Sequence, residues 1–148
     1  MADDTGRIEA IYIAAEHEEL PHPVDSVRAI AGKGLEGNRY FDEGRPEAEL
    51  TLIEAEALEA LLDEHGIALD AATSRRNVLV RGVRLNDLVG KTFRVGEIEC
   101  RGIELCEPCT HLEGLTQKGV IKGLVHRGGL NAQILTSGTL RPGDAIAA

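Results

Sequence analysis

The sequence has no tryptophan and only four other aromatic residues, two tyrosines and two phenylalanines, among its 148 residues. A folded core must therefore be built from aliphatic side chains. These are available, because hydrophobic residues make up 43% of the chain. The scarcity of aromatic rings also argues against single-stranded nucleic-acid binding, which depends on aromatic surfaces that stack on bases.

Positive charge is scarce as well: 16 Lys and Arg residues stand against 25 Asp and Glu residues, giving a formal charge of −9. This balance argues against binding to nucleic-acid phosphates and to anionic membrane surfaces. The sequence has no apolar run of the roughly 18 residues that a membrane span needs. Its first residues, Met1-Ala2-Asp3-Asp4, are acidic where a secretory signal would be basic. We therefore expect a cytoplasmic protein with neither a nucleic-acid nor a membrane partner.

The length predicts a single domain over residues 1–148, large enough to bury about 70% of its unfolded surface. Short alternating segments bounded by turn residues predict many strands, and residues 54–65 give the only strong helix signal. Strands are expected over 7–15, 24–31, 49–53, 75–82, 92–95, 98–103, 130–136 and 145–148, with a loop over 70–74. The sequence therefore predicts a mainly β fold with one long helix, an α+β chain forming a closed or partly open β-barrel.

The predicted helix over 54–65 places Leu58, Leu61, Leu62 and His65 on one face, and Gly66 follows at the C-cap position. We expect this face to pack on the sheet. Nothing in the segment suggests a chemical role.

Two of the three cysteines, Cys106 and Cys109, stand three positions apart with Pro108 between them, and His111 follows. The stretch comes directly after a predicted strand that Pro108 must end, so its thiols lie in a strand-end loop. A zinc site would need four ligands, which the stretch does not supply. A thioredoxin-like dithiol would need a surrounding βαβ pattern, which the sequence does not show. A metal ligand, a nucleophile, a redox pair and structural cysteines all remain open, whereas Cys100 alternates inward as a small buried residue.

Several segments in the same order resemble one known family. Residues 34–39, Gly-Leu-Glu-Gly-Asn-Arg, are similar to a Gly-Leu-x-Gly-Asp-Arg turn, with Asn38 where Asp is usual. Residues 75–82 resemble an Arg-x-Asn-aliphatic segment, and Glu107-Pro108-Cys109 falls where the family has its cysteine. Residues 128–132 and 138–144 resemble its closing strand pair. Over nearly its whole length the chain resembles the MOSC domain, named for the C-terminal part of molybdenum cofactor sulfurase.

This resemblance implies a barrel-like β fold that binds molybdenum cofactor, with Cys109 as metal ligand and catalytic residue. It implies reduction of small N-hydroxylated compounds, such as amidoximes and hydroxylaminopurines. An external electron-donor protein would be needed, because the sequence shows no flavin, haem or iron–sulfur site. Binding of pyridoxal phosphate is associated with the MOSC family as a whole. The alternatives are a non-catalytic carrier of cofactor or persulfide sulfur, and a dithiol redox protein using Cys106 and Cys109.

A molybdopterin carries a phosphate, so its pocket should contain cations and N–H donors, and arginine offers a fork that fits phosphate. In an acidic chain, arginines at separate strand ends are most easily explained if they converge, although each alone could be a solvated charge. His111 is a candidate partner for the thiolate. The candidate cofactor-binding residues are Asn38, Arg39, Arg75, Arg76, Asn77, His126 and Arg127.

Overall fold

The computed structural model describes residues 6–106 and 128–147, and this part of the chain is mainly β. The strands are β1 (Gly6–Ile13), β2 (His22–Val24), β3 (Val27–Ile30), β4 (Gly34–Leu35), β5 (Leu50–Glu54), β6 (Val78–Arg81), β7 (Thr92–Val95), β8 (Ile98–Leu105), β9 (Leu130–Ile134), β10 (Gly138–Leu140) and β11 (Ala145–Ala147). The helices are α1 (Ala55–His65) and the single turn α2 (Ala71–Ser74), and 3-10 turns cover Pro46–Ala48 and Leu85–Leu88.

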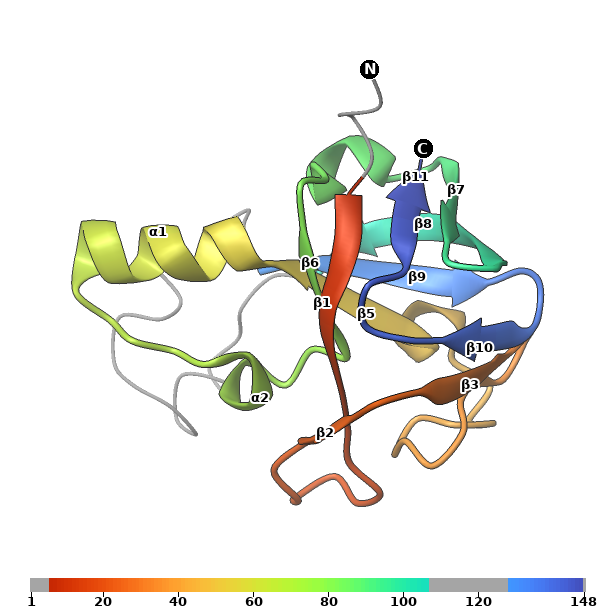
Figure 1. Cartoon of the computed structure of the whole chain (residues 1–148). Coiled ribbons are helices and arrows are strands. Elements are labelled where there is room, and N and C mark those ends of the chain that lie inside the picture. Colours follow the sequence, from red (N-terminus) through yellow and green to blue (C-terminus); the bar gives the residue numbers. More distant parts are fainter. Residues whose placement is uncertain (1–5, 107–127, 148) are drawn as a thin grey trace.

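Seven of these strands close into a barrel in the order β11-β7-β8-β9-β5-β6-β1. The ring closes because β1 pairs with β11, where Gly6 lies opposite Ile146. β2 extends the sheet beyond β1, and a second sheet, β10-β3-β4, lies beside the barrel (Figure 1). The predicted fold, a mainly β barrel with one long helix, is confirmed.

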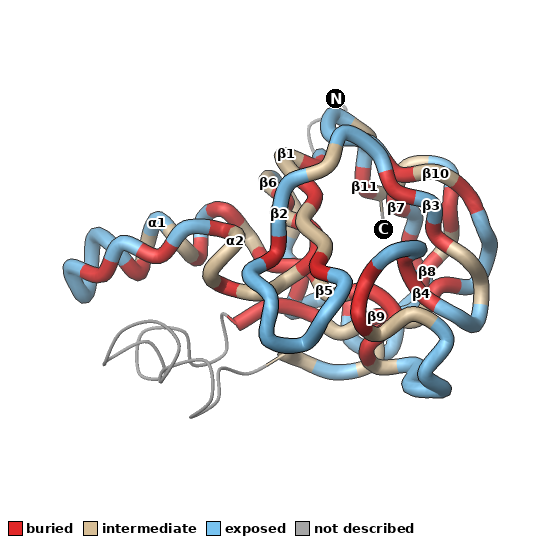
Figure 2. The backbone as a smooth tube through the Cα atoms, turned by 90° about the horizontal axis from the view of Figure 1, so that it is seen from below, coloured by how far each residue is buried: buried red, intermediate tan, exposed pale blue. Residues whose placement is uncertain are grey.

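The barrel interior is filled by aliphatic side chains from nearly every strand. Ile11, Leu52, Val80 and Leu130 are completely buried, and Phe93 is the aromatic residue among them. Buried residues recur along the strands in Figure 2, whereas the loop between β1 and β2 is exposed. Because strand side chains alternate between faces, every second residue of β6, β7 and β9 is buried.

α1 confirms the predicted helix, and Gly66 ends it in the left-handed conformation at φ 68°. The helix connects β5 to β6, which pair in parallel within an otherwise antiparallel ring. The helix projects from the barrel wall (Figure 1). On its predicted apolar face, Leu61 is completely buried in a small cluster with Ile67 and Leu69, separate from the barrel core, whereas Leu62 is 50% exposed. Only part of the expected face is therefore buried. Within residues 6–106 and 128–147, no helix is both long and apolar enough to cross a membrane.

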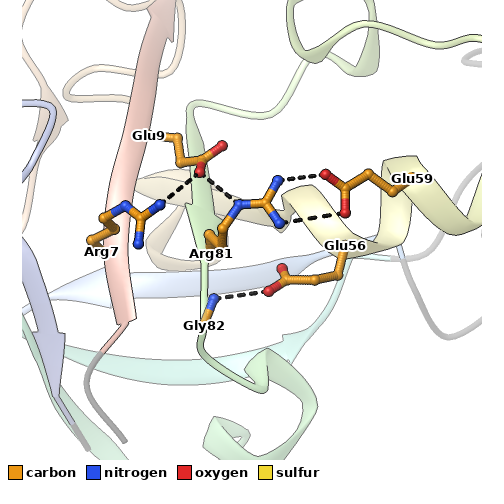
Figure 3. A network of polar contacts seen from close by, with 6 residues as sticks. All are labelled: Arg7, Glu9, Glu56, Glu59, Arg81 and Gly82. Carbon is orange, nitrogen blue, oxygen red and sulfur yellow. Dashed lines mark hydrogen bonds and ion pairs between the residues drawn. The ribbon is translucent and has the colours of Figure 1, made fainter. Parts of the chain in front are cut away.

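Carboxylates attach α1 to the barrel where apolar burial is limited. Arg81 on β6 lies between Glu9 on β1 and Glu59 on α1, at 2.6 and 2.5 Å (Figure 3). One turn earlier on the helix, Glu56 accepts a hydrogen bond from the Gly82 N–H. The polar network thus fixes the direction in which α1 leaves the sheet.

Two local predictions differ from the structure. The expected loop over 70–74 is the short helix α2, because the Asp70 side chain accepts the Thr73 N–H at 2.9 Å and so caps a helical turn. The single extended segment expected over 24–31 is divided between β2 and β3, which belong to different sheets.

Candidate functional site

A cavity of about 220 Å³ lies at one end of the barrel, where segments far apart in sequence meet. Three of the predicted arginines, Arg39, Arg75 and Arg76, line it together with Cys106. The other lining residues are Tyr40, Arg45, Glu47, Ala48, Thr51 and Asn131.

Arg39 is nearly buried, at 9% exposure, in the glycine-rich turn after β4. Its Nη1 donates to Asn38 Oδ1 at 3.3 Å and its Nη2 donates to the Arg75 carbonyl at 3.2 Å. Asn38 Oδ1 also accepts the Ala14 N–H, and the Arg39 guanidinium lies 5.0 Å from the centre of the Tyr40 ring. Burial lowers the pKa of Arg39, and the positive charge of Arg75 lowers it further. The turn therefore holds a desolvated cation in a fixed position.

Arg75 ends α2 in the left-handed conformation, with φ 64°. Its Nη1 donates to the Glu19 carbonyl at 3.1 Å, and its Nη2 donates to the His17 carbonyl at 2.5 Å. These contacts attach the loop between β1 and β2 to the cavity wall. The His17 ring in turn packs edge-on against Tyr40, with ring centres 5.0 Å apart.

Arg76 joins the end of β8 to the residues just before β9. Its Nε donates to the Gly128 carbonyl at 2.7 Å, and its Nη2 donates to the Cys106 carbonyl at 3.1 Å. A third bond runs from Nη1 to the Ser74 carbonyl at 3.1 Å. The Cys106 N–H donates to the Gly129 carbonyl at 2.7 Å, so both main-chain groups of Cys106 are engaged.

The charge of this arginine group is not balanced by acidic side chains in the described part of the chain. None of the ion pairs among residues 6–106 and 128–147 involves Arg39, Arg75 or Arg76. Glu47 is the one carboxylate among the residues that line the cavity, and it pairs with Arg45 at 3.1 Å. Four arginines and one glutamate give the lining a formal charge of +3 in a chain of −9. Such a site is suited to an anion.

The two predicted asparagines support the site from behind and do not line the cavity. Asn77 is 2% exposed; its Oδ1 accepts from the Thr51 N–H and hydroxyl, and its Nδ2 donates to the Tyr12 carbonyl. It therefore ties β5 and the start of β6 to β1 directly after Arg75 and Arg76 in the chain. Asn38 holds Arg39 in the same indirect way. Cys109, His111, His126 and Arg127 lie outside the described residues.

Sequence reasoning did not select several residues of the cavity wall. Tyr40 directly follows the glycine-rich turn over residues 34–39, so the sequence pointed to its neighbourhood. Arg45 and Glu47 belong to no motif. Cys106 entered the sequence argument only as half of a dithiol, yet it lines the cavity. Cys100 is fully buried, as expected; burial raises the pKa of its thiol to about 12, and the nearby Glu49 adds to this effect.

The structure also bears on the zinc and dithiol alternatives. Among the residues described, no three His, Cys, Asp or Glu side chains gather as a metal site would require. A parallel pair does occur elsewhere in the sheet, since α1 connects β5 to β6. The cysteine stretch, however, lies between β8 and β9, which are antiparallel.

Comparisons with known proteins agree with this fold. A family model of the MOSC domain matches residues 40–147. The structure is similar to the YuaD protein of Bacillus subtilis, with a TM-score of 0.82, 16% identity, and coverage of 96% of this chain and 94% of that one. It is also similar to YiiM from Geobacillus stearothermophilus, with a TM-score of 0.76, 15% identity, and coverage of 96% and 74%. For YiiM from Escherichia coli the TM-score is 0.70 at 17% identity, with coverage of 95% and 68%.

A search of curated proteins gave no match. With the family match spanning most of its length, the chain belongs to the MOSC domain family.

Proposed function

We propose that the chain binds molybdenum cofactor in the arginine-lined cavity, with Cys109 as the thiolate ligand of the metal. It acts as the terminal component of a reductase for small N-hydroxylated compounds. The observation that supports this most is the group of Arg39, Arg75 and Arg76, whose charge no carboxylate in the described residues neutralises. Family membership supports the cofactor, because MOSC domains are associated with it at the family level.

The arginine geometry suits the phosphate of a molybdopterin. A guanidinium has five N–H donors, and the main-chain and Asn38 contacts use three on Arg76 and two each on Arg39 and Arg75. Donors therefore remain for a ligand, and the existing contacts fix their direction. Preorganised cations of this kind bind an anion without a large cost in side-chain entropy.

A cysteine thiol suits the metal. Thiolate is a good ligand for soft metals, and it binds in its deprotonated form. The cations that hold the phosphate also favour a thiolate. Cys106, the last described residue before Cys109, lines the cavity, and Cys109 follows it by three positions in the sequence.

The bound cofactor would supply two-electron redox chemistry. Reduction of an N-hydroxyl group takes two electrons and two protons, breaks the N–O bond and releases water, and the electrons come from an external donor protein. The chain's own residues orient the cofactor and limit the access of water. Glu47, whose pKa is lowered by its own backbone N–H and by Arg45, stays ionised at neutral pH and leaves the arginine charge only partly balanced.

A matched pair of variants tests this proposal: Cys109→Ser and Cys106→Ser, both produced in a host that makes the cofactor. We expect Cys109→Ser to lose molybdenum and hydroxylamine-reductase turnover, and Cys106→Ser to keep most of both. Metal analysis and turnover with an added electron donor give the two readouts. Equal damage from both changes would favour a dithiol mechanism, because a disulfide needs both sulfurs. A wild-type protein without molybdenum that accepts sulfane sulfur would favour the carrier function.

A further inference from the structure

Cys106 shares a small cavity with three arginines, and the proposed function gives it no role. Its N–H and carbonyl are both engaged, by Gly129 and Arg76, so its backbone is held on both sides at the end of β8. The residue is half-buried and belongs to the cavity lining. The group that it can contribute to chemistry in the cavity is its thiol.

The three guanidinium groups lie close enough to act on one another electrostatically. The charges of Arg75 and Arg76 both contribute to lowering the pKa of Arg39. The Arg76 guanidinium contacts the Cys106 carbonyl itself, so a positive charge lies within one residue's length of the thiol. The cavity walls exclude part of the solvent, which weakens the screening of this charge.

Such surroundings have two consequences for a thiol. Neighbouring arginines stabilise the thiolate, which is the nucleophilic form of cysteine. A cleft lined by one sign of charge also concentrates ions of the opposite sign, and this raises association rates by about 10- to 1,000-fold. The two effects together favour reagents that carry negative charge over neutral reagents of equal reactivity.

We propose that Cys106, together with Arg39, Arg75 and Arg76, forms a thiol modification site that selects small anionic electrophiles. In the reaction the thiol proton passes to solvent, and the sulfur attacks the electrophilic carbon. A carbon–sulfur bond forms and the leaving group departs with its electron pair. The site shares Arg39, Arg75 and Arg76 with the proposed phosphate site, so it concerns the cofactor-free protein, and its reaction needs no metal.

The test compares iodoacetate with iodoacetamide, two alkylating reagents that differ in charge, on molybdenum-free Cys109→Ser protein. In this protein Cys106 is the reactive thiol, because Cys100 is fully buried and the pKa of its thiol is raised to about 12. The measurement is the second-order rate constant for iodoacetate divided by that for iodoacetamide. This ratio is determined in native protein at low salt and in urea-unfolded protein. Peptide mass spectrometry identifies the alkylated residue. We expect the native ratio to exceed the unfolded ratio by about tenfold or more.

Two further measurements identify the arginines as the cause. Raising the salt concentration to about 1 M shortens the screening length to roughly 3 Å and should return the native ratio toward the unfolded value. Arg75→Ala should lower the ratio several-fold, while Arg94→Ala, which removes an exposed arginine paired with Glu99, should leave it unchanged. If Arg75→Ala does not fold, the salt dependence of the parent protein still decides the question.

Equal ratios in native and unfolded protein would overturn the proposal, as would the absence of alkylation at Cys106 in native protein. A ratio that does not respond to salt would also overturn it. Each of these outcomes leaves the assignment of Cys109 untouched, since no molybdenum is present. Conversely, loss of molybdenum in Cys109→Ser says nothing about charge selection at Cys106.

Discussion

Arg76 and Arg81 lie five positions apart, the first just before β6 and the second at its end, and their charges are paired in opposite ways. Arg81 lies between Glu9 and Glu59 (Figure 3), and these carboxylates raise its pKa. Arg76 donates instead to three main-chain carbonyls, those of Ser74, Cys106 and Gly128. Both side chains connect distant parts of the chain, so both help to hold the fold together.

The difference lies in what remains for a ligand. A carboxylate fixes an arginine and cancels its charge, whereas a carbonyl fixes it and leaves the charge in place. Arg39 and Arg75 follow the pattern of Arg76, since each donates to a main-chain carbonyl and neither pairs with a carboxylate in the described residues. The cavity therefore combines a rigid geometry with a charge that an anion can satisfy.

The largest effect is expected from Gly129→Ala, at the residue whose carbonyl accepts the Cys106 N–H. Gly129 has φ 115°, and an added Cβ would lie 2.1 Å from the Leu52 carbonyl oxygen. Backbone strain and overpacking together should cost about 3 kcal/mol or more of unfolding free energy. Gly143→Ala is the control: it also has positive φ, but nothing lies within 4 Å of its added Cβ. Urea denaturation of the two variants measures the difference, and equal losses would show that the close approach at Gly129 is unimportant.

A smaller loss is expected from Asn77→Ala, because Asn77 supports the cavity without lining it. The change removes the acceptor for the Thr51 N–H and the donor to the Tyr12 carbonyl inside the barrel. Unsatisfied buried groups of this kind cost about 1–3 kcal/mol each. We expect stability and molybdenum content to fall together in this variant. A fall in molybdenum content at unchanged thermal stability would mean instead that Asn77 contacts the ligand directly.

The smallest effect is expected at the Arg81 network. The hydrogen bond from Arg81 lowers the pKa of Glu59 below its ordinary value. A lowered carboxyl pKa contributes stability above the unfolded pKa of about 4.3, and this contribution disappears as the pH falls through the folded value. Glu59→Gln should therefore lower the Tm at pH 7 by no more than about 2–4 °C, since exposed ion pairs contribute little. Well below the folded pKa of Glu59 the variant and the wild type should melt together, and a gap that persists there would contradict the assignment.

Much of the fold could be predicted because its signals are local. Alternation marked β7 and β8, and a Leu-rich face with a following glycine marked α1. The barrel closure, however, depends on pairing between β1 and β11 at the two ends of the chain, which no local pattern encodes. The short helix α2 was missed although Asp70 and Thr73 have the spacing of a cap, because four residues give no periodicity.

The site was predictable in part for the same reason. Arginines beside turns at different strand ends suggested convergence, and Arg39, Arg75 and Arg76 do line one cavity. Their partners could not be predicted, because every residue has a carbonyl and the sequence gives no sign of which one an arginine will reach. Arg76 finds carbonyls 30 and 52 positions away. The burial of Arg39 likewise depends on the packing of several segments.

The most direct test of the account measures molybdenum per chain in Arg75→Ala and Arg81→Ala, each purified from a cofactor-competent host beside the wild type. Each change removes an arginine that bonds to other segments, but only Arg75 lines the cavity. We predict that Arg75→Ala loses most of its molybdenum while Arg81→Ala keeps the wild-type amount. Equal molybdenum content in the two variants, or a wild-type protein that carries none, would contradict the proposal that the arginine cavity holds the cofactor.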